Sequence, residues 1–453
     1  MIKKYLLFIF SLSFSLFACG QSFEGSWTGT LVLPTVKLPT VFEFTYDGQW
    51  KGTMQSPSQS MAKLPFSAIK ADGDSIHVEV RSFGIKYSGK LSSDKQAITG
   101  QVQQGSMRAP LDFKKGPWKS YKRPQAINPP YSYDTVNVKI PNKEDAVVLA
   151  GTITRPKSGG KHPAVVLVTG SGPQDRNSTI YGHQSFKLIA DYLTKRGIVV
   201  LRYDDRGVGQ STGIYTQATT SDFGKDALSA LNYLSKQADV DPKKVGIIGH
   251  SEGGLIATIL AGQRVPSLKF IVDLAGPAIA IDSLMVLQSE AVMKVQGKTM
   301  SAQDRALIKK NYEIVKSKLS AEEAFEALMA NMQAVPGSQN VQFGDEIGVL
   351  VTPWYRHFMK IDPIPFIKKI NIPVFAAFGG TDVQVIAAPN MESLTDNLPR
   401  NPKSIVKVYP GLNHLFQTSK TGSHLEYGDI EETFSPEVLK DMADWILDLD
   451  NRS

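Results

Sequence analysis

The spacing of hydrophobic positions changes near residue 133, and this change divides the chain into two segments. From Phe23 to about Lys115, short runs such as Val41 to Thr45 and Ile76 to Val80 alternate apolar with polar residues, and turn residues separate the runs. A period of two residues is typical of strands that bury one face. The first segment therefore predicts a small all-β sandwich or barrel.

After Tyr133 the apolar runs become nearly continuous, and helical patterns separate them. Continuous apolar runs indicate strands of a parallel sheet that is buried on both faces, because half-exposed strands alternate instead. The eight expected strands are 136–140, 147–155, 164–168, 198–202, 244–248, 270–274, 372–378 and 405–409. We expect a mostly parallel eight-stranded sheet with helices on both faces.

The alternation of strands and helices is interrupted from about 278 to 368. Three amphipathic helical patterns lie in this insert, at 282–296, 301–319 and 321–332. A helical insert that interrupts a sheet is a candidate lid, and structural padding is the alternative. The expected domains are then an all-β domain over 20–123, a Pro-rich linker over 124–132 and an α/β domain over 133–453.

Residues 1–19 have the pattern of a signal peptide, with a basic start followed by an apolar run that is too short to span a membrane. The only cysteine, Cys19, ends the run Leu16-Phe17-Ala18-Cys19, which is similar to a bacterial lipoprotein box. Cleavage after Gly20 by an ordinary signal peptidase is the alternative. We expect an exported protein, either periplasmic or extracellular, or one anchored to the bacterial membrane through a lipidated Cys19.

Composition narrows the classes of function. The 453 residues are 42% hydrophobic and 21% charged, which is typical of a soluble globular protein. The net charge of +7 comes from basic residues scattered among acidic ones, so we expect no nucleic-acid partner. The seven histidines lack the spacing of paired metal ligands, so we expect no metal.

Two serines lie in GxSxG motifs, which are weak signals when taken alone. Ser251, in Gly249-His250-Ser251-Glu252-Gly253, follows an apolar strand and precedes an apolar helix. Ser211 has neither neighbour. A nucleophilic serine is held in a tight turn directly between a strand and a helix. We therefore predict that Ser251 is a nucleophile.

A serine hydroxyl needs a base within hydrogen-bond reach and an acid that orients the base. Asp382 follows the strand expected at 372–378, and His414 lies in the loop after the last expected strand. A helix cap for Asp382 and a surface loop position for His414 are the alternatives. The order serine, acid, histidine favours a catalytic triad. His424 is the nearest rival base, but no strand leads into it.

The tetrahedral intermediate of acyl transfer needs two N–H donors that stabilise its oxyanion. One is expected from the backbone of Glu252, directly after the nucleophile. We expect the other from the loop after the 164–168 strand, at Ser171, with Gly172 as the second choice. A plain turn is the alternative for this loop.

Five motifs in order resemble the α/β-hydrolase superfamily, within it bacterial esterases related to the serine aminopeptidase and dienelactone hydrolase branches, some of which carry an N-terminal β domain. They are 170–176, 204–211, 249–254, 380–382 and 413–414, and the resemblance covers Tyr133 to Leu449. It implies carboxylesterase activity without a cofactor. It also implies that the Asp-Arg pairs at 175–176 and 205–206 brace loops. The aromatic cluster Trp354 to Phe358, expected at the end of a strand, lines an acyl pocket or belongs to the core.

The expected function is hydrolysis of small-molecule carboxylic esters by a Ser-His-Asp triad through an acyl-enzyme intermediate. A serine peptidase or aminopeptidase that acts on small peptides is the first alternative. A non-catalytic surface binding protein is the second. The sequence leaves the natural substrate and the oligomeric state open.

Overall fold

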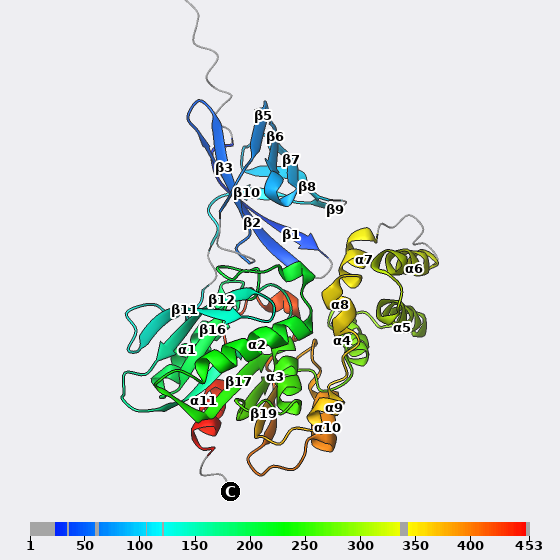
Figure 1. Cartoon of the computed structure of the whole chain (residues 1–453). Helices are drawn as coiled ribbons and strands as arrows, with labels where there is room; N and C mark the ends of the chain where they lie inside the picture. The colour runs from blue at the N-terminus through cyan, green and yellow to red at the C-terminus, as the bar shows by residue number, and fades with distance from the viewer. Residues whose placement is uncertain are drawn as a thin grey trace, which may run out of the picture. The chain divides into compact units, whose positions relative to one another are not determined.

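The computed structural model describes residues 23–33, 36–58, 63–105, 107–119, 122–335 and 343–449. The chain divides into two compact units between Ser120 and Tyr121 (Figure 1). The predicted signal peptide and Cys19 lie outside the described residues. Within these residues no helix combines the length and apolar character that a membrane crossing requires.

The first unit is an antiparallel half-barrel, so the all-β prediction is confirmed. Its strands follow the order β4-β3-β2-β1-β10-β8-β7-β6-β5, and β9 pairs with β8. The strands are β1 (Gly25–Leu33), β2 (Val36–Tyr46), β3 (Trp50–Gln55), β4 (Leu64–Pro65), β5 (Ala68–Asp72), β6 (Ser75–Val80), β7 (Ile85–Leu91), β8 (Ala97–Gln104), β9 (Met107–Pro110) and β10 (Phe113–Lys115).

Aromatic side chains from alternate strand positions form the core of the first unit. Phe42 lies edge-on to Tyr87, with ring centroids 5.3 Å apart, and 4.3 Å from Phe113. Trp27 is fully buried, and its indole N–H donates to the carbonyl of Phe23 at 2.7 Å. Large rings contribute most of the buried area in so small a core. The period-two pattern of the sequence therefore specifies the fold of this unit.

The segment predicted as a linker is fastened to the second unit. The Arg123 guanidinium, directly before it, donates to the carbonyls of Tyr181 and Gly428 at 2.6 and 2.9 Å. The side chain of Gln125 donates to the carbonyl of Phe434 and accepts from the N–H of Thr433. These side chains satisfy backbone groups of distant loops, and residues 122–132 therefore belong structurally to the second unit.

The second unit contains an eight-stranded sheet in the order β11-β12-β16-β13-β17-β18-β19-β20. The contacts of β12 with β11 and with β16 are antiparallel, and all later contacts are parallel. The strands are β11 (Asp134–Asn142), β12 (Val147–Arg155), β13 (His162–Val168), β16 (Val199–Tyr203), β17 (Val240–His250), β18 (Phe270–Leu274), β19 (Val374–Gly379) and β20 (Ile405–Tyr409). A short hairpin, β14 (Thr179–Ile180) and β15 (His183–Gln184), precedes α1.

Helices cover the sheet, and they are labelled in Figure 1. Helix α2 packs against α3, and α1 packs against α11. The helices outside the insert are α1 (Ser185–Lys195), α2 (Thr220–Leu234), α3 (Glu252–Gly262), α10 (Ala387–Asn397) and α11 (Pro436–Leu447). The central residues Val165, Val200 and Ile247 are fully buried. This burial explains why their strands are continuous apolar runs.

The insert forms helices α4 (Ile281–Val295), α5 (Ala302–Lys316), α6 (Ala321–Gln333), α7 (Gly344–Leu350), α8 (Pro353–Phe358) and α9 (Ile364–Ile367). Capping boxes start α5 at Ser301 with Asp304, and α6 at Ser320 with Glu323. The prediction that the aromatic cluster Trp354 to Phe358 ends a strand is wrong. Thr352 caps α8 and Pro353 occupies its first turn, so the cluster is helical.

A buried acid lies where β18 packs against α3. The Asp273 carboxylate accepts the N–H of Gly276 at 2.7 Å and leaves no room for a Cβ at Gly254. Burial raises the pKa of Asp273 to about 7. The folded protein therefore holds a proton that the unfolded chain releases near pH 4.

We predict that the Asp273→Asn substitution stabilises the protein at pH 8. The wild-type free energy of unfolding should fall as pH rises from about 4 to 7, because the native state binds more protons in that window. The gain should reach at most about 4 kcal/mol at pH 8 and vanish below pH 4, since each pH unit between the two pKa values corresponds to about 1.4 kcal/mol. Urea unfolding at several pH values measures it.

The exposed Asp396 of α10 provides a matched control. Asp396→Asn should leave the pH profile of stability unchanged, because its carboxylate is solvated in both states. An Asp273→Asn profile parallel to that of the wild type would contradict the prediction.

Candidate active site

Ser251 lies in a strained turn between β17 and α3. Its backbone has φ 55° and ψ −120°, in a region that residues with a side chain rarely adopt. Its N–H donates to the carbonyl of Leu274 at 2.9 Å. A Cβ at Gly249 would approach the Gly253 carbonyl oxygen to 2.0 Å, and a Cβ at Gly253 would approach that of Val168 to 2.1 Å. The motif therefore needs glycine at both positions.

His414 and Asp382 form a buried pair in the loops after β20 and β19. Nδ1 of His414 lies 2.7 Å from Oδ2 of Asp382. The other carboxylate oxygen accepts the backbone N–H groups of Gln384 and Val385 at 2.7 and 3.0 Å. An aspartate held in this way fixes the imidazole with its proton on Nδ1 and leaves Nε2 as an acceptor.

His250 connects the nucleophile elbow to the His414 loop. Its Nε2–H donates to the backbone carbonyl of His414 at 2.8 Å, and the two ring centroids are 4.8 Å apart. Burial, together with the nearby His414, lowers the pKa of His250 to about 4. A neutral His250 therefore anchors the His414 backbone.

A buried amide network shapes the loop that carries His414. Oδ1 of Asn413 accepts the N–H groups of Leu415 and Gln417 at 2.9 and 3.0 Å. The side chain of Gln417 lies 3.0 Å from Nε2 of His183, which belongs to β15. The sequence did not predict this network, because Gln417 and His183 lie 234 residues apart in the chain.

The loop after β13 approaches Ser251 closely. A Cβ at Gly170 would lie 3.1 Å from Cβ of Ser251. The loop is held by Asp205, which accepts from the hydroxyl of Thr169 at 2.7 Å and from the N–H of Gln174 at 2.9 Å. The predicted donor Ser171 thus directly follows the residue that packs against the elbow.

Ion pairs brace the neighbouring loops. Arg176 binds Asp204 through two nitrogens, at 2.9 and 2.6 Å. Arg206 binds Asp226 and Asp145, each at 2.7 Å. Fork-like pairs of this kind fix geometry as well as charge. The expected bracing role of both arginines agrees with these contacts.

Ser211, the serine of the second GxSxG motif, is occupied by backbone contacts. Its hydroxyl donates to the carbonyl of Asp204 at 2.7 Å and accepts the N–H of Ala150 at 2.8 Å. A hydroxyl engaged on both sides holds its loop against β12. It is not positioned beside a base.

The carboxylate of Glu252 is the main feature that the sequence analysis missed. The side chain is buried and accepts from three donors in separate segments: Ser171 Oγ at 2.8 Å, Thr220 Oγ1 at 2.7 Å and Trp354 Nε1 at 2.9 Å. Burial raises its pKa, while the three donors oppose that rise. Glu252 therefore links the loop after β13, helix α2 and the insert helix α8.

The five predicted site residues lie at one edge of the sheet. Ser171 follows β13, Ser251 and Glu252 follow β17, Asp382 follows β19, and His414 follows β20. The carboxyl edge of parallel strands is where sites of α/β proteins lie. Hydrogen bonds join Asp382 to His414 and Ser171 to Glu252. Across the described ranges, no group of three or more metal-ligating side chains is arranged to hold a metal ion.

A strained serine between a strand and a helix, at the same sheet edge as a buried histidine-aspartate pair, is typical of the α/β-hydrolase class. The chain belongs to the family described as "Serine aminopeptidase, S33", whose model matches residues 182–419. The predicted superfamily is confirmed, and the protein is a hydrolase.

The chain is similar to several other proteins. Esterase EstD of Thermotoga maritima is 27% identical over 82% of this chain and 80% of its own length. The protein Rv2307c of Mycobacterium tuberculosis is 33% identical over 27% of this chain and 40% of its own length. The esterase Pf2001 of Pyrococcus furiosus aligns in structure with a TM-score of 0.41 and 16% identity, over 73% of this chain and 98% of its own.

We predict that Glu252→Gln lowers the free energy of unfolding by about 1 to 3 kcal/mol. A carboxamide has one acceptor oxygen and a donating nitrogen, so at least one of the three donors to this buried group loses its acceptor. Urea unfolding at pH 7 measures the change. Glu313→Gln, on the exposed face of α5, is the matched control and should change stability by less than about 0.5 kcal/mol. Equal unfolding midpoints for both variants would show that the three hydrogen bonds to the Glu252 carboxylate do not stabilise the fold.

Proposed function

We propose that the protein hydrolyses carboxylic esters of small molecules by two-step acyl transfer. Ser251 attacks the ester carbonyl, and His414 takes the hydroxyl proton and passes it to the leaving alcohol. Water then attacks the acyl-enzyme, and His414 again serves as base. Asp382 holds His414 in the tautomer that leaves Nε2 free to accept the proton.

The observation that carries this proposal is the 2.7 Å bond between His414 and Asp382, with both side chains buried at the same sheet edge as the strained Ser251. A histidine oriented by a buried carboxylate is the base that a serine nucleophile requires. The anchor from His250 to the His414 carbonyl supports it, because it ties the base-bearing loop to the elbow.

We propose the backbone N–H groups of Glu252 and Ser171 as the oxyanion hole. Glu252 begins α3, where the first N–H groups of a helix have no partner within the helix and carry a partial positive charge. Gly170 approaches Ser251 closely. This approach supports the loop after β13 as the source of the second donor. The Ser171 hydroxyl bond to the Glu252 carboxylate then holds both donors in one arrangement.

We propose the helical insert as a lid over this site. Trp354 of α8 donates its indole N–H to the Glu252 carboxylate, one residue after the nucleophile. A lid that contacts the buried Glu252 side chain would exclude water from the reacting carbonyl. It would also shape the acyl pocket.

Ester hydrolysis is favoured over peptide hydrolysis by the name of the relative that covers most of the chain, an esterase of T. maritima. The family description makes an aminopeptidase the second candidate. The two differ in the leaving group, an alcohol or an amine, so a panel of p-nitrophenyl esters and aminoacyl p-nitroanilides separates them. The ester proposal expects turnover of the esters at much higher kcat/KM than of the anilides.

We also propose that the protein is exported, on the signal-peptide pattern of residues 1–19. Lipidation of Cys19 would tether it to a membrane, whereas cleavage after Gly20 would release it. The mass of the mature N-terminus distinguishes these outcomes.

We predict that Ser251→Ala abolishes p-nitrophenyl acetate hydrolysis and labelling by a fluorophosphonate, because both require the serine hydroxyl. Ser211→Ala, in the second GxSxG motif, is the matched control. It should keep the activity and the labelling while losing about 1 to 2 kcal/mol of stability, because two hydrogen bonds disappear. Retained turnover in Ser251→Ala would eliminate the proposed nucleophile.

We predict that Asp382→Asn lowers kcat by about 10³ to 10⁴-fold with a smaller change in KM. An amide in this position no longer favours the tautomer with the proton on Nδ1, and in comparable triads that loss is of this size. Steady-state kinetics on p-nitrophenyl acetate provide the measurement. A loss of less than tenfold would show that Asp382 does not orient the base.

A further inference from the structure

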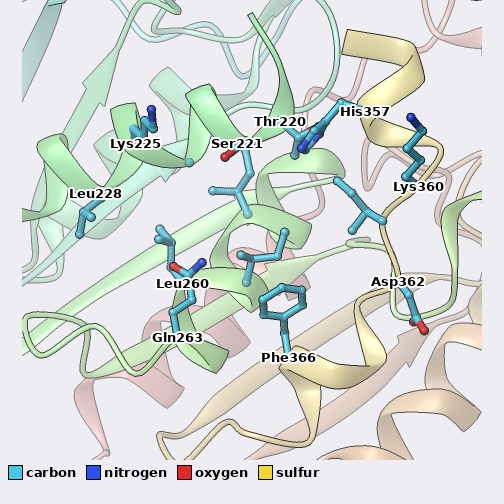
Figure 2. Close-up of a pocket in the computed structure, with 14 residues that line it drawn as sticks. Thr220, Ser221, Lys225, Leu228, Leu260, Gln263, His357, Lys360, Asp362 and Phe366 are labelled. Atoms are coloured by element: carbon cyan, nitrogen blue, oxygen red, sulfur yellow. The ribbon is translucent and has the colours of Figure 1, made fainter. Parts of the chain in front are cut away.

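A cavity of about 550 Å³ lies between helices α2 and α3 and the end of the insert. Its volume is within the range of small-molecule sites. Figure 2 shows Thr220, Ser221 and His357 at one end, and Gln263 and Phe366 at the other. Neither His414 nor Asp382 lines this cavity, so it is separate from the proposed catalytic pair.

Aliphatic and aromatic side chains line much of the cavity. Leu228 comes from α2, Ile259 and Leu260 come from α3, and Phe366 comes from α9. Apolar surface that stays exposed in a concave site favours burial of a ligand's hydrocarbon part, at about 25 cal/mol per Å² of apolar area. The lining therefore suits an extended aliphatic chain.

Polar groups with unfilled bonding capacity lie near the other end. Nδ1 of His357 is buried, and within the described residues it has no hydrogen-bond partner. Lys360 is exposed, and its ammonium makes no ion pair with any described residue. A buried ring nitrogen without a partner is unfavourable, and the exposed Lys360 is the cation at this end that a ligand oxygen can reach.

The other charged side chains of the lining are Lys225, which has ion-pair partners, and Asp362, which has a backbone hydrogen bond. Lys225 pairs with Glu144 at 2.9 Å and with Asp145 at 3.1 Å. Asp362 accepts the N–H of Ile364 at 3.0 Å, at the start of α9. Lys360 and Asp362 are therefore the lining charges without an ion-pair partner among the described residues, and Lys360 is the one that complements an anion.

Gly224 keeps part of the cavity open. It lies within α2, where glycine weakens a helix relative to alanine. A Cβ at this position would meet no atom within 4 Å. A larger side chain at Gly224 therefore fits the helix and occupies the cavity, which makes this position suitable for a test.

We propose that this cavity is a second ligand site, which binds an aliphatic carboxylate of medium chain length. The hydrocarbon chain lies against Leu228, Ile259, Leu260 and Phe366. The carboxylate lies near Lys360 and His357, with the hydroxyl of Ser221 as a further donor. Such carboxylates are also the acyl products of the proposed ester hydrolysis, but the assignment rests on the lining and its charge.

The site is connected to the proposed catalytic centre by two contacts. Thr220 lines the cavity and donates its hydroxyl to the Glu252 carboxylate at 2.7 Å. His357 lines it one helical turn after Trp354, which binds the same carboxylate. A bound carboxylate therefore lies next to Thr220, which holds Glu252, and next to the helix whose Trp354 binds the Glu252 carboxylate.

The test is isothermal titration of the full chain with decanoate. Decanoate should bind the wild type in a 1:1 ratio, and Gly224→Leu should abolish the binding. Gly348→Leu, at an equally open glycine in α7, is the matched control and should bind as the wild type does. Gly224→Ala should retain binding, which shows that a loss in Gly224→Leu comes from filling the cavity. Thermal unfolding verifies that each variant is folded.

Two further titrations test the anionic end. Lys360→Gln should weaken decanoate binding about fivefold, as expected for an exposed ion pair. Neutral decanol should bind more weakly than decanoate. Equal binding of decanol and decanoate, or decanoate binding that survives Gly224→Leu, would overturn the proposal.

Protein labelled at Ser251 with a fluorophosphonate separates this site from the catalytic one. Labelled protein should bind decanoate with the wild-type Kd, whereas loss of binding after labelling would place the carboxylate in the catalytic pocket and overturn the second site. Failure of the labelling would count against the proposed esterase, while titration of the unlabelled variants would still decide on the cavity.

Discussion

The close packing of backbone around Ser251 is the constraint on which the rest of the site depends. The ends of β13 and β17 and the start of α3 approach so closely that Gly249 and Gly253 have no room for a Cβ, and Gly170 has little. The same crowding holds Ser251 at a positive φ, at a strain of about 1 to 3 kcal/mol. The surrounding sheet has to compensate for that strain, and its central strands are almost completely buried.

Buried acids, rather than apolar contacts alone, organise the loops around this turn. Asp205 holds the loop after β13, and burial raises its pKa to about 7. Glu252 joins that loop to α2 and α8, and Asp273 occupies the space beside α3. A buried carboxylate is costly to desolvate unless donors surround it, as they do at Asp205 and Glu252, or unless it binds a proton, as the raised pKa of Asp273 favours. Such groups contribute little net stability, but they restrict the loops to one arrangement.

The insert and the cavity extend this arrangement away from the elbow. Helix α8 directs Trp354 to Glu252 and His357 to the cavity, from positions one turn apart. One short helix therefore contacts both the proposed catalytic centre and the proposed second site. The positions of these side chains follow from the cap at Thr352, because it sets where the helix begins.

The sequence by itself determined the strands of the sheet and the strand-turn-helix context of Ser251. Strand periodicity, helix caps and the strand-turn-helix context of Ser251 are local features. Each depends on backbone geometry over a few consecutive residues, so the residue pattern of that segment indicates it. The tertiary structure decided the partners. The donors to Glu252 lie 81, 32 and 102 residues away, and the Pro-rich segment is held by carbonyls about 300 residues downstream. Periodicity carries no record of such contacts, because the side chains meet only after the sheet has assembled.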